Sequence, residues 1–251
     1  MLHAVAVCPP APVMLEGLGG AGDPAAWLRR RSAETVAWLV STGARRIVVV
    51  GEGPATRCWP VDAPFSTGIF TGRGGPGVIL ALPVALALGR QLLLSNAADP
   101  ARLGCLAVAP DESPASCLAR GAELADGADS LGLLVMADGA RDHDVTDRPA
   151  DQARAAGELD RALLRAFTVA DPGALAALDP AVAATVGCSP RAVWQVLAGA
   201  GGSAFPSRQP VARVDYHGAP FGVTYLIGTW DLTDASQQDS DAQTAPEGAT
   251  G

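Results

Sequence analysis

Residues 46–50 read Arg-Ile-Val-Val-Val, and Gly51, Glu52 and Gly53 follow directly. Such a β-branched run is typical of a strand that is buried on both faces of a parallel sheet. Two further apolar runs, Leu-His-Ala-Val-Ala-Val-Cys (2–8) and Leu-Gly-Leu-Leu-Val-Met-Ala (131–137), predict strands of the same kind. Longer segments with helical periodicity separate these runs. The alternation predicts an α/β fold with a mostly parallel central sheet and helices on both faces.

The remaining elements follow from periodicity and from turn residues. We expect further strands at 78–82, 105–109, 211–216 and 222–229, and helices at 24–41, 83–94 and 112–125, with three more between 151 and 200. The pairs Asp23-Pro24, Asp171-Pro172, Asp179-Pro180 and Ser189-Pro190 each predict a helix start, with a capping residue before a first-turn proline.

The pattern predicts a single domain over residues 1–232, followed by a disordered acidic tail over 233–251. The tail consists of small and polar residues that cannot bury enough apolar surface to order themselves. Residues 51–77 form a long segment rich in Gly and Pro, and loops of this length are often functional. Gly72, Gly74 and Gly77 match the GxGxxG pattern, but an apolar run follows instead of a helix, so we interpret them as a flexible loop.

The charge and composition exclude several classes of function. The 251 residues are 49% hydrophobic and carry a formal net charge of −8, with Arg but no Lys. This charge disfavours a nucleic acid or an anionic membrane as partner, and the absence of Lys excludes a P-loop and Schiff-base chemistry. Five scattered cysteines support neither a disulfide framework nor a zinc ribbon, and with no targeting signal or membrane-spanning run we expect a soluble cytoplasmic protein.

Ligands of open parallel sheets bind beyond the carboxyl ends of the strands. The polar groups that follow the predicted strands are therefore the candidates for lining a pocket, although charged loop residues are ordinarily just solvated. These candidates are Cys8, Glu52, Arg57, Asp138, Arg141 and His143. Asp138, Arg141 and His143 are also candidates for a catalytic role, and Arg57 and Arg141 are suited to bind a carboxylate or phenolate. Cys58 and Cys188 could join Cys8 as soft-metal ligands, but ordinary packing is the expected role of such thiols.

Several stretches together resemble the class III extradiol ring-cleavage dioxygenase superfamily, and within it the subunit-B-like (LigB-like) proteins of actinobacteria. They are Ala-Val-Ala-Val-Cys-Pro-Pro-Ala-Pro (4–12), Arg-Ile-Val-Val-Val-Gly-Glu-Gly-Pro (46–54), Leu-Leu-Val-Met-Ala-Asp-Gly-Ala-Arg (133–141), Ala-Val-Trp-Gln-Val-Leu-Ala-Gly-Ala (192–200) and Tyr-His-Gly-Ala-Pro-Phe-Gly-Val-Thr-Tyr-Leu-Ile-Gly-Thr-Trp (216–230). The resemblance covers nearly all of residues 1–230.

The resemblance implies a mononuclear Fe(II) enzyme, in which two His and one carboxylate hold the metal and a further His is the acid/base. The ligand positions fall here at Pro10, Gly53 and Ser189, and the acid/base position falls at Arg141, with His143 two residues later. Proline and glycine have no side-chain donor. The expected ferrous site is therefore not matched, and we predict no metal site at these positions.

The sequence contains only three histidines. His3 begins the first strand, so roughly 16 Å separate it from the carboxyl end of that strand. His217 is expected to be a half-exposed turn residue. His143 is better placed, but Asp142 and Asp144 flank it, which favours a polar loop.

Three hypotheses stay open. The first is a dioxygenase-like protein that has lost its iron, has no cofactor and acts by binding a small molecule or a partner. The second is an active ring-cleavage dioxygenase or related oxidoreductase that holds Fe(II) through non-standard ligands such as Glu52, Asp138, His143 or a thiolate. The third is an assembly partner, as a homo-oligomer or as one of two kinds of subunit.

Overall fold

The computed structural model describes residues 1–15, 22–65, 81–205 and 209–233. The strands are β1 (Leu2–Cys8), β2 (Arg46–Glu52), β3 (Arg57–Trp59), β4 (Leu103–Val108), β5 (Leu131–Met136), β6 (Val211–Gly218) and β7 (Tyr225–Asp231). The α-helices are α1 (Ala26–Ser41), α3 (Val84–Ser95), α4 (Pro114–Asp126), α5 (Ala150–Thr168), α6 (Pro172–Ala176), α7 (Pro180–Thr185) and α8 (Arg191–Ala204), and two short 3₁₀ turns span Pro12–Met14 and Pro100–Arg102.

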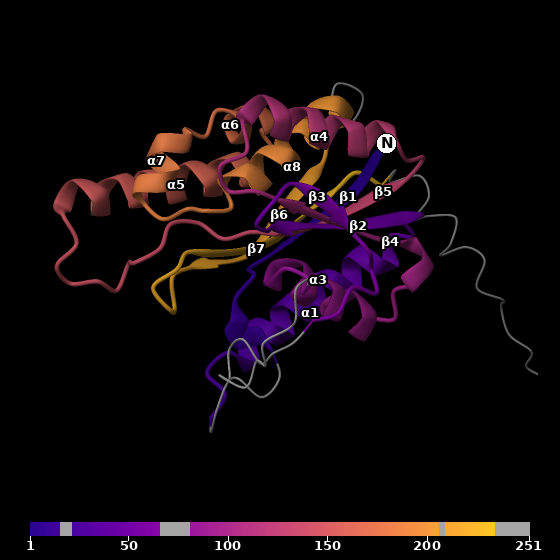
Figure 1. The fold of residues 1–251 in the computed structure, drawn as a ribbon, viewed down its shortest axis with the longest axis horizontal. Coiled ribbons are helices and arrows are strands. Elements are labelled where there is room, and N and C mark those ends of the chain that lie inside the picture. The colour runs from indigo at the N-terminus through magenta and orange to yellow at the C-terminus, as the bar shows by residue number, and fades with distance from the viewer. Residues whose placement is uncertain (16–21, 66–80, 206–208, 234–251) are drawn as a thin grey trace, which may run out of the picture.

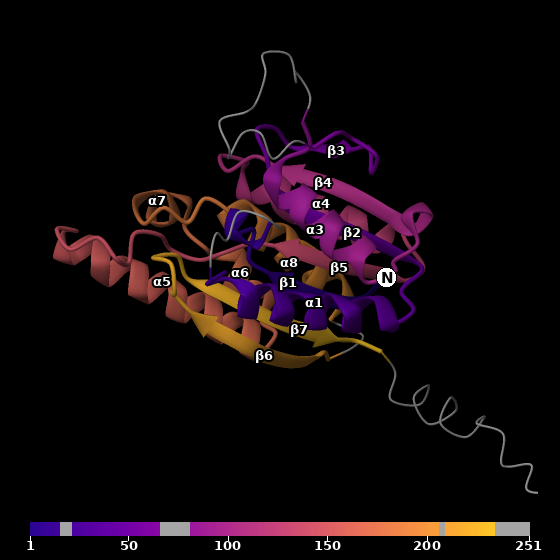
Figure 2. The same cartoon turned by 90° about the horizontal axis from the view of Figure 1, so that it is seen from below.

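All seven strands form one sheet in the order β3-β4-β2-β5-β1-β7-β6. Helices α1 and α3 cover one face, and α4 with α5 to α8 covers the other (Figure 1). The view in Figure 2 shows α1 and α3 lying across the sheet. The α/β class with helices on both faces is thereby confirmed.

The prediction of a mostly parallel sheet holds for the centre of the sheet but not for its edges. Strands β4, β2, β5 and β1 are parallel to one another, but β3 pairs with β4, β7 with β1, and β6 with β7 in antiparallel fashion. The reason lies in the connections: the short link 219–224 allows only an antiparallel hairpin between β6 and β7, because a parallel crossover needs a dozen residues or more. The sheet is therefore mixed, with a parallel centre and antiparallel edges.

Alternate residues of the central strands supply two separate apolar cores. Val5 and Val7 of β1 belong to the core under α4 to α8, whereas Ala4, Ala6 and Cys8 belong to the core under α1 and α3. Every residue of β5 is buried. This double coverage explains why the central strands read as continuous apolar runs.

Several boundaries differ from the prediction. Residues 57–59 form a short strand within the expected loop, and four helices occupy the region where three were expected. The carboxylates of Asp171 and Asp179 cap α6 and α7 as predicted, but α1 starts after Ala25 and α8 after Pro190 without a side-chain cap. Asp23 instead forms an ion pair with Arg29. Most of the predicted strand at 78–82, the glycines 72, 74 and 77, and residues 234–251 of the predicted tail lie outside the described residues.

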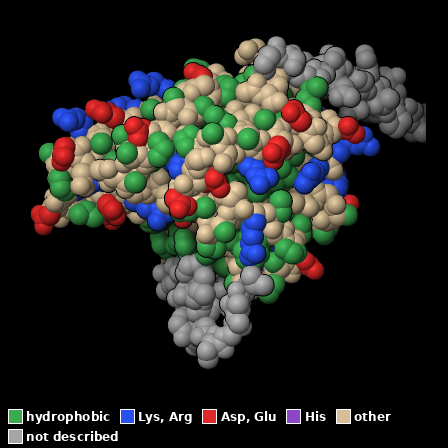
Figure 3. Space-filling view, turned by 45° about the horizontal axis from the view of Figure 1, so that its top comes forward, with side chains coloured by type: hydrophobic (Ala, Val, Ile, Leu, Met, Phe, Trp, Pro, Cys, Tyr) green, Lys and Arg blue, Asp and Glu red, His purple; other side chains and the backbone are tan. Residues whose placement is uncertain are grey.

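Acidic and basic side chains are interspersed on the face shown in Figure 3. One exposed ion pair joins neighbouring turns of α5, between Arg154 and Glu158. None of the helices in the described ranges is both long enough and apolar enough to cross a bilayer.

Candidate functional site

The parallel strands end together at one edge of the sheet, which we call the carboxyl edge. Met136 of β5 lies in register with Cys8 of β1 on one side and with Gly51 of β2 on the other. Residues one or two positions further along each chain therefore meet at this edge. They include Pro10, Glu52 and Asp138.

Asp138 is a buried carboxyl group with one unpaired oxygen. Its side chain is 7% exposed, its Oδ2 lies 3.8 Å from Nη2 of Arg141, and its Oδ1 has no hydrogen-bond partner. Burial raises the pKa of Asp138 to about 7; the Arg141 guanidinium lowers it, and the Glu52 and Asp160 carboxylates raise it. Glu52 reaches the same edge because Gly51 of β2 is in register with Met136 of β5. The structure therefore brings together three of the residues predicted from the sequence, Glu52, Asp138 and Arg141.

A second buried oxygen without a partner is the hydroxyl of Ser189. The preceding residue, Cys188, has its thiol 3.9 Å from the carbonyl oxygen of Asp138, and Trp194 Nε1 donates to the same carbonyl at 2.9 Å. Ser189 and Asp138 thus belong to one end of the sheet. Unpaired polar atoms in buried positions are rare in folded proteins, and each requires an explanation.

Tyr225 begins β7 at the same edge and is buried. Burial raises the pKa of Tyr225 to about 12, and the nearby Asp138 carboxylate contributes to the rise. The phenol therefore stays protonated at neutral pH and remains a hydrogen-bond donor.

His143 belongs to a network beside this edge rather than to the Asp138 cluster itself. Its Nε2 lies 2.9 Å from Oδ2 of Asp160 and 3.0 Å from Oγ1 of Thr224. The Thr224 hydroxyl donates to the same Asp160 oxygen at 2.7 Å, and the backbone N–H of Ala140 donates to the other at 2.9 Å. The network fixes the loop that follows β5, which is where Asp138 and Arg141 lie.

Three of the other candidates lie elsewhere. The Cys8 thiol points toward α1, 3.9 Å from the carbonyl oxygen of Ser32, and burial raises its pKa to about 12. Arg57 lies over the ring of Trp59 at 3.9 Å, on the edge strand β3 three strands from β5, which is roughly 14 Å. Cys58, its neighbour on β3, is exposed.

The remaining histidines do not join the site. Nε2 of His3 lies 3.0 Å from the carbonyl oxygen of Thr42, at the opposite end of β1. His217 is on β6, and burial lowers its pKa while Asp160 raises it. Within the described ranges, no three His, Cys, Asp or Glu side chains gather closely enough to hold a metal ion.

Sequence reasoning missed Asp160, Thr224 and Tyr225. Asp160 had a detectable signal, because it lies on the apolar face of α5 with Ala156, Leu159 and Leu163. A carboxylate in such a stripe needs buried donors, and Thr224 and Ala140 provide them. Thr224 had no comparable signal, since it is an ordinary polar residue before a strand.

Comparison with known proteins shows the fold and no more. No family model and no curated protein matches this chain. Among solved structures, the uncharacterised protein JW3007 of Escherichia coli K12 aligns with a TM-score of 0.50 and 13% sequence identity, over 91% of this chain and 99% of that one.

Proposed function

We propose that this chain is a class III extradiol dioxygenase-like protein that has lost the ferrous site and binds a small molecule at the carboxyl edge of its sheet. The observation that carries the proposal is the unpaired Oδ1 of Asp138, a carboxyl oxygen that is buried without a donor. Burying such an atom is unfavourable unless a donor reaches it. A ligand with an O–H or N–H group would supply that donor.

The residues at the superfamily ligand positions do not fit Fe(II). Pro10 and Gly53 offer no side-chain donor, and Ser189 offers a neutral hydroxyl where a carboxylate is expected. Pro10 lies two residues after the end of β1, Gly53 directly follows β2, and Ser189 lies beside Asp138 through Cys188. The three positions therefore occupy the expected end of the sheet, but with side chains that cannot ligate the metal.

The polar groups at this edge indicate which chemical groups the ligand should carry. The unpaired Oδ1 of Asp138 can accept a hydrogen bond from a ligand, and the Ser189 hydroxyl can donate or accept one. The guanidinium of Arg141, 45% exposed, can receive a negative or strongly polar group at the opening. A hydroxylated aromatic compound combines these features. The substrates that the resemblance implies, catechols, are of this class, and catechol is therefore the probe.

The alternatives predict different outcomes. An active oxygenase would need non-standard metal ligands, and the imidazole among them, His143, has its Nε2 engaged with Asp160 and Thr224. An assembly subunit would bind catechol weakly or not at all.

The test uses the full chain, purified without chelator, and measures iron content, oxygen uptake with catechol and catechol affinity by calorimetry. The variant is Asp138→Asn, and its matched control is Asp142→Asn, which changes an exposed carboxylate whose backbone φ of 61° asparagine tolerates. We expect little iron, no ring-cleavage product, and an affinity that falls roughly tenfold or more in Asp138→Asn only. Stoichiometric iron with ring-cleavage product would overturn the loss of the ferrous site, and equal affinities would overturn the role of Asp138.

A further inference from the structure

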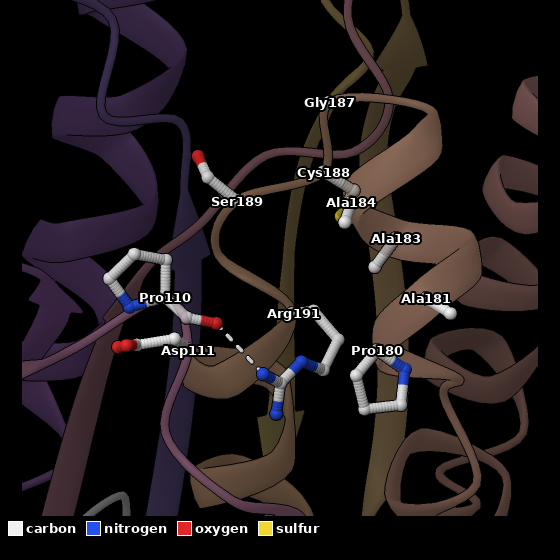
Figure 4. A pocket seen from close by; sticks show the side chains of 10 residues that line it. All are labelled: Pro110, Asp111, Pro180, Ala181, Ala183, Ala184, Gly187, Cys188, Ser189 and Arg191. Atoms are coloured by element: carbon white, nitrogen blue, oxygen red, sulfur yellow. Dashed lines mark hydrogen bonds between the residues drawn. The ribbon is translucent and has the colours of Figure 1, made fainter.

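A pocket of about 550 Å³ opens beside the carboxyl edge, with which it shares Ser189, between the connection that follows β4 and the segment from α7 to α8 (Figure 4). Its size lies within the range typical of small-molecule sites. The pocket, which we call the Arg191 pocket, is lined by Pro110, Asp111, Pro180, Ala181, Ala183, Ala184, Gly187, Cys188, Ser189 and Arg191.

Most of the lining is apolar. Ala181, Ala183 and Ala184 of α7 and Pro180 at its start form one wall, and Pro110 lies across from them (Figure 4). The Ser189 hydroxyl points away from Arg191 in this view, which is consistent with its place at the carboxyl edge. The walls therefore suit an apolar body such as an alkyl chain or an aromatic ring.

Arg191 is the charged group of the pocket, and it is only 3% exposed. Nη1 donates to the carbonyl oxygen of Glu112 at 2.9 Å and to Oε1 of Gln195 at 2.6 Å, and Nη2 donates to the carbonyl oxygen of Pro110 at 2.8 Å. These bonds use three of the five N–H donors of a guanidinium. All three acceptors are neutral.

No carboxylate in the described part of the chain forms an ion pair with Arg191. Burying a cation without a counter-charge is strongly unfavourable, which favours an external anion as partner. Arg191 is also the first residue of α8, and the dipole of that helix adds positive potential at this end.

Two carboxylates near the opening could repel an anion bound at Arg191. Asp111 lines the pocket, but it is exposed and its carboxylate points away from Arg191 in Figure 4. Asp179 precedes the pocket wall and accepts hydrogen bonds from the backbone N–H groups of Ala181 and Val182. Its carboxylate therefore caps the start of α7. Both are screened by water more than the buried guanidinium is.

We infer that the Arg191 pocket binds a small carboxylic acid with an apolar body, whose carboxylate meets Arg191 and whose body lies along the alanines of α7. Ser189 borders both sites, but the inference rests on the buried charge of Arg191, whereas the proposed function rests on Asp138. The exposed carboxylate of Asp111 lines the same pocket, so its charge opposes this binding.

The experiment measures binding of octanoate to the full chain by calorimetry, with octan-1-ol as a neutral probe of the same length. Ala184→Trp fills the pocket, and Val182→Trp is its matched control, because Val182 is exposed on the same helix and does not line the pocket. Arg191→Ala is unsuitable alone, since it removes bonds that hold the connection after β4. Asp111→Asn tests the repulsion, and Asp138→Asn separates this site from the carboxyl edge.

We expect octanoate to bind the wild type and Val182→Trp with equal affinity. Its affinity for Ala184→Trp should be lower by roughly tenfold or more, and its affinity for Asp111→Asn should be higher than for the wild type. Octan-1-ol should bind at least about tenfold more weakly than octanoate, and Asp138→Asn should leave octanoate binding unchanged. Equal binding of the two probes, unchanged binding in Ala184→Trp, or no octanoate binding at all would each overturn the inference. A loss of catechol binding in Asp138→Asn with octanoate binding intact would support both sites separately.

Discussion

Asp138 is a carboxyl group that holds its proton more tightly in the folded protein than in the unfolded chain. Burial raises its pKa from 3.8 to about 7, a shift that the Arg141 guanidinium opposes and the carboxylates of Glu52 and Asp160 support. Below pH 3.8 the carboxyl is neutral in both states, so it imposes no penalty there. As the pH rises toward 7, the unfolded chain releases the proton first. The contribution of Asp138 to stability is therefore lost over this range.

The corresponding prediction concerns the pH dependence of unfolding. The free energy of unfolding of the wild type should fall, relative to that of Asp138→Asn, between pH values of about 4 and about 7, by about 1.4 kcal/mol for each unit of pKa shift. Urea denaturation of both proteins at these two pH values measures the difference. Parallel pH profiles for the two proteins would show that Asp138 has an ordinary pKa.

Thr224 is a second residue whose hydroxyl has a definite task. It donates to the buried carboxylate of Asp160 and lies within hydrogen-bond distance of His143. Thr224→Val should lower the free energy of unfolding by about 1–3 kcal/mol, because the carboxylate loses a buried donor. Thr185→Val is the control, since the Thr185 hydroxyl bonds only to a carbonyl of its own exposed turn. Similar losses in the two variants would argue against a structural role for the network.

At the scale of elements, α4 and α8 pack closely because two glycines face the opposite helix. A Cβ added at Gly199 would collide with the carbonyl oxygen of Leu118, and one added at Gly121 would collide with the carbonyl oxygen of Val196. The clash involves backbone atoms that cannot rotate aside. The spacing of the two helices is therefore set by these glycines, and it determines where the start of α8 places Arg191.

Gly199→Ala should destabilise the protein by about 1–3 kcal/mol despite the better helix propensity of alanine. Gly202→Ala on the same helix should instead stabilise it by up to about 1 kcal/mol, because an added Cβ there meets nothing within 4 Å. Thermal or urea unfolding of both variants measures the two effects. Effects of the same sign would mean that propensity, rather than close packing, governs α8.

At the scale of the whole molecule, the strands of the centre and the late pair β6 and β7 were predictable, whereas β3 and the pairing of β7 with β1 were not. The apolar runs of β1, β2 and β5 are long enough to identify strands with both faces buried. By contrast, β3 spans only Arg57–Trp59, and its exposed Arg57 and Cys58 give no alternating pattern. The antiparallel pairing of β7 with β1 depends on where the chain returns after α8, which local sequence does not encode.

Some residues of the candidate site were likewise predictable from the sequence, and others were not. Asp138 and Arg141 were predictable because they directly follow a central strand, and a ligand site is expected there. Asp160 and Tyr225 reach the same region from α5 and β7, so only the packing of distant elements brings them in. Arg57 was misplaced for a related reason: its segment turns back along β4 and away from the centre of the sheet.

The unequal exposure of the five thiols has a practical consequence for spectroscopy. Cys8, Cys105, Cys117 and Cys188 are buried, and burial raises the pKa of each, so little reactive thiolate is present at neutral pH. Cys58 is exposed, and the sequence has no lysine to compete for an electrophile. A maleimide fluorophore should therefore attach once, and intact mass should show a single adduct that Cys58→Ser abolishes. The native protein thus has an attachment point for a dye on β3 without any engineered cysteine.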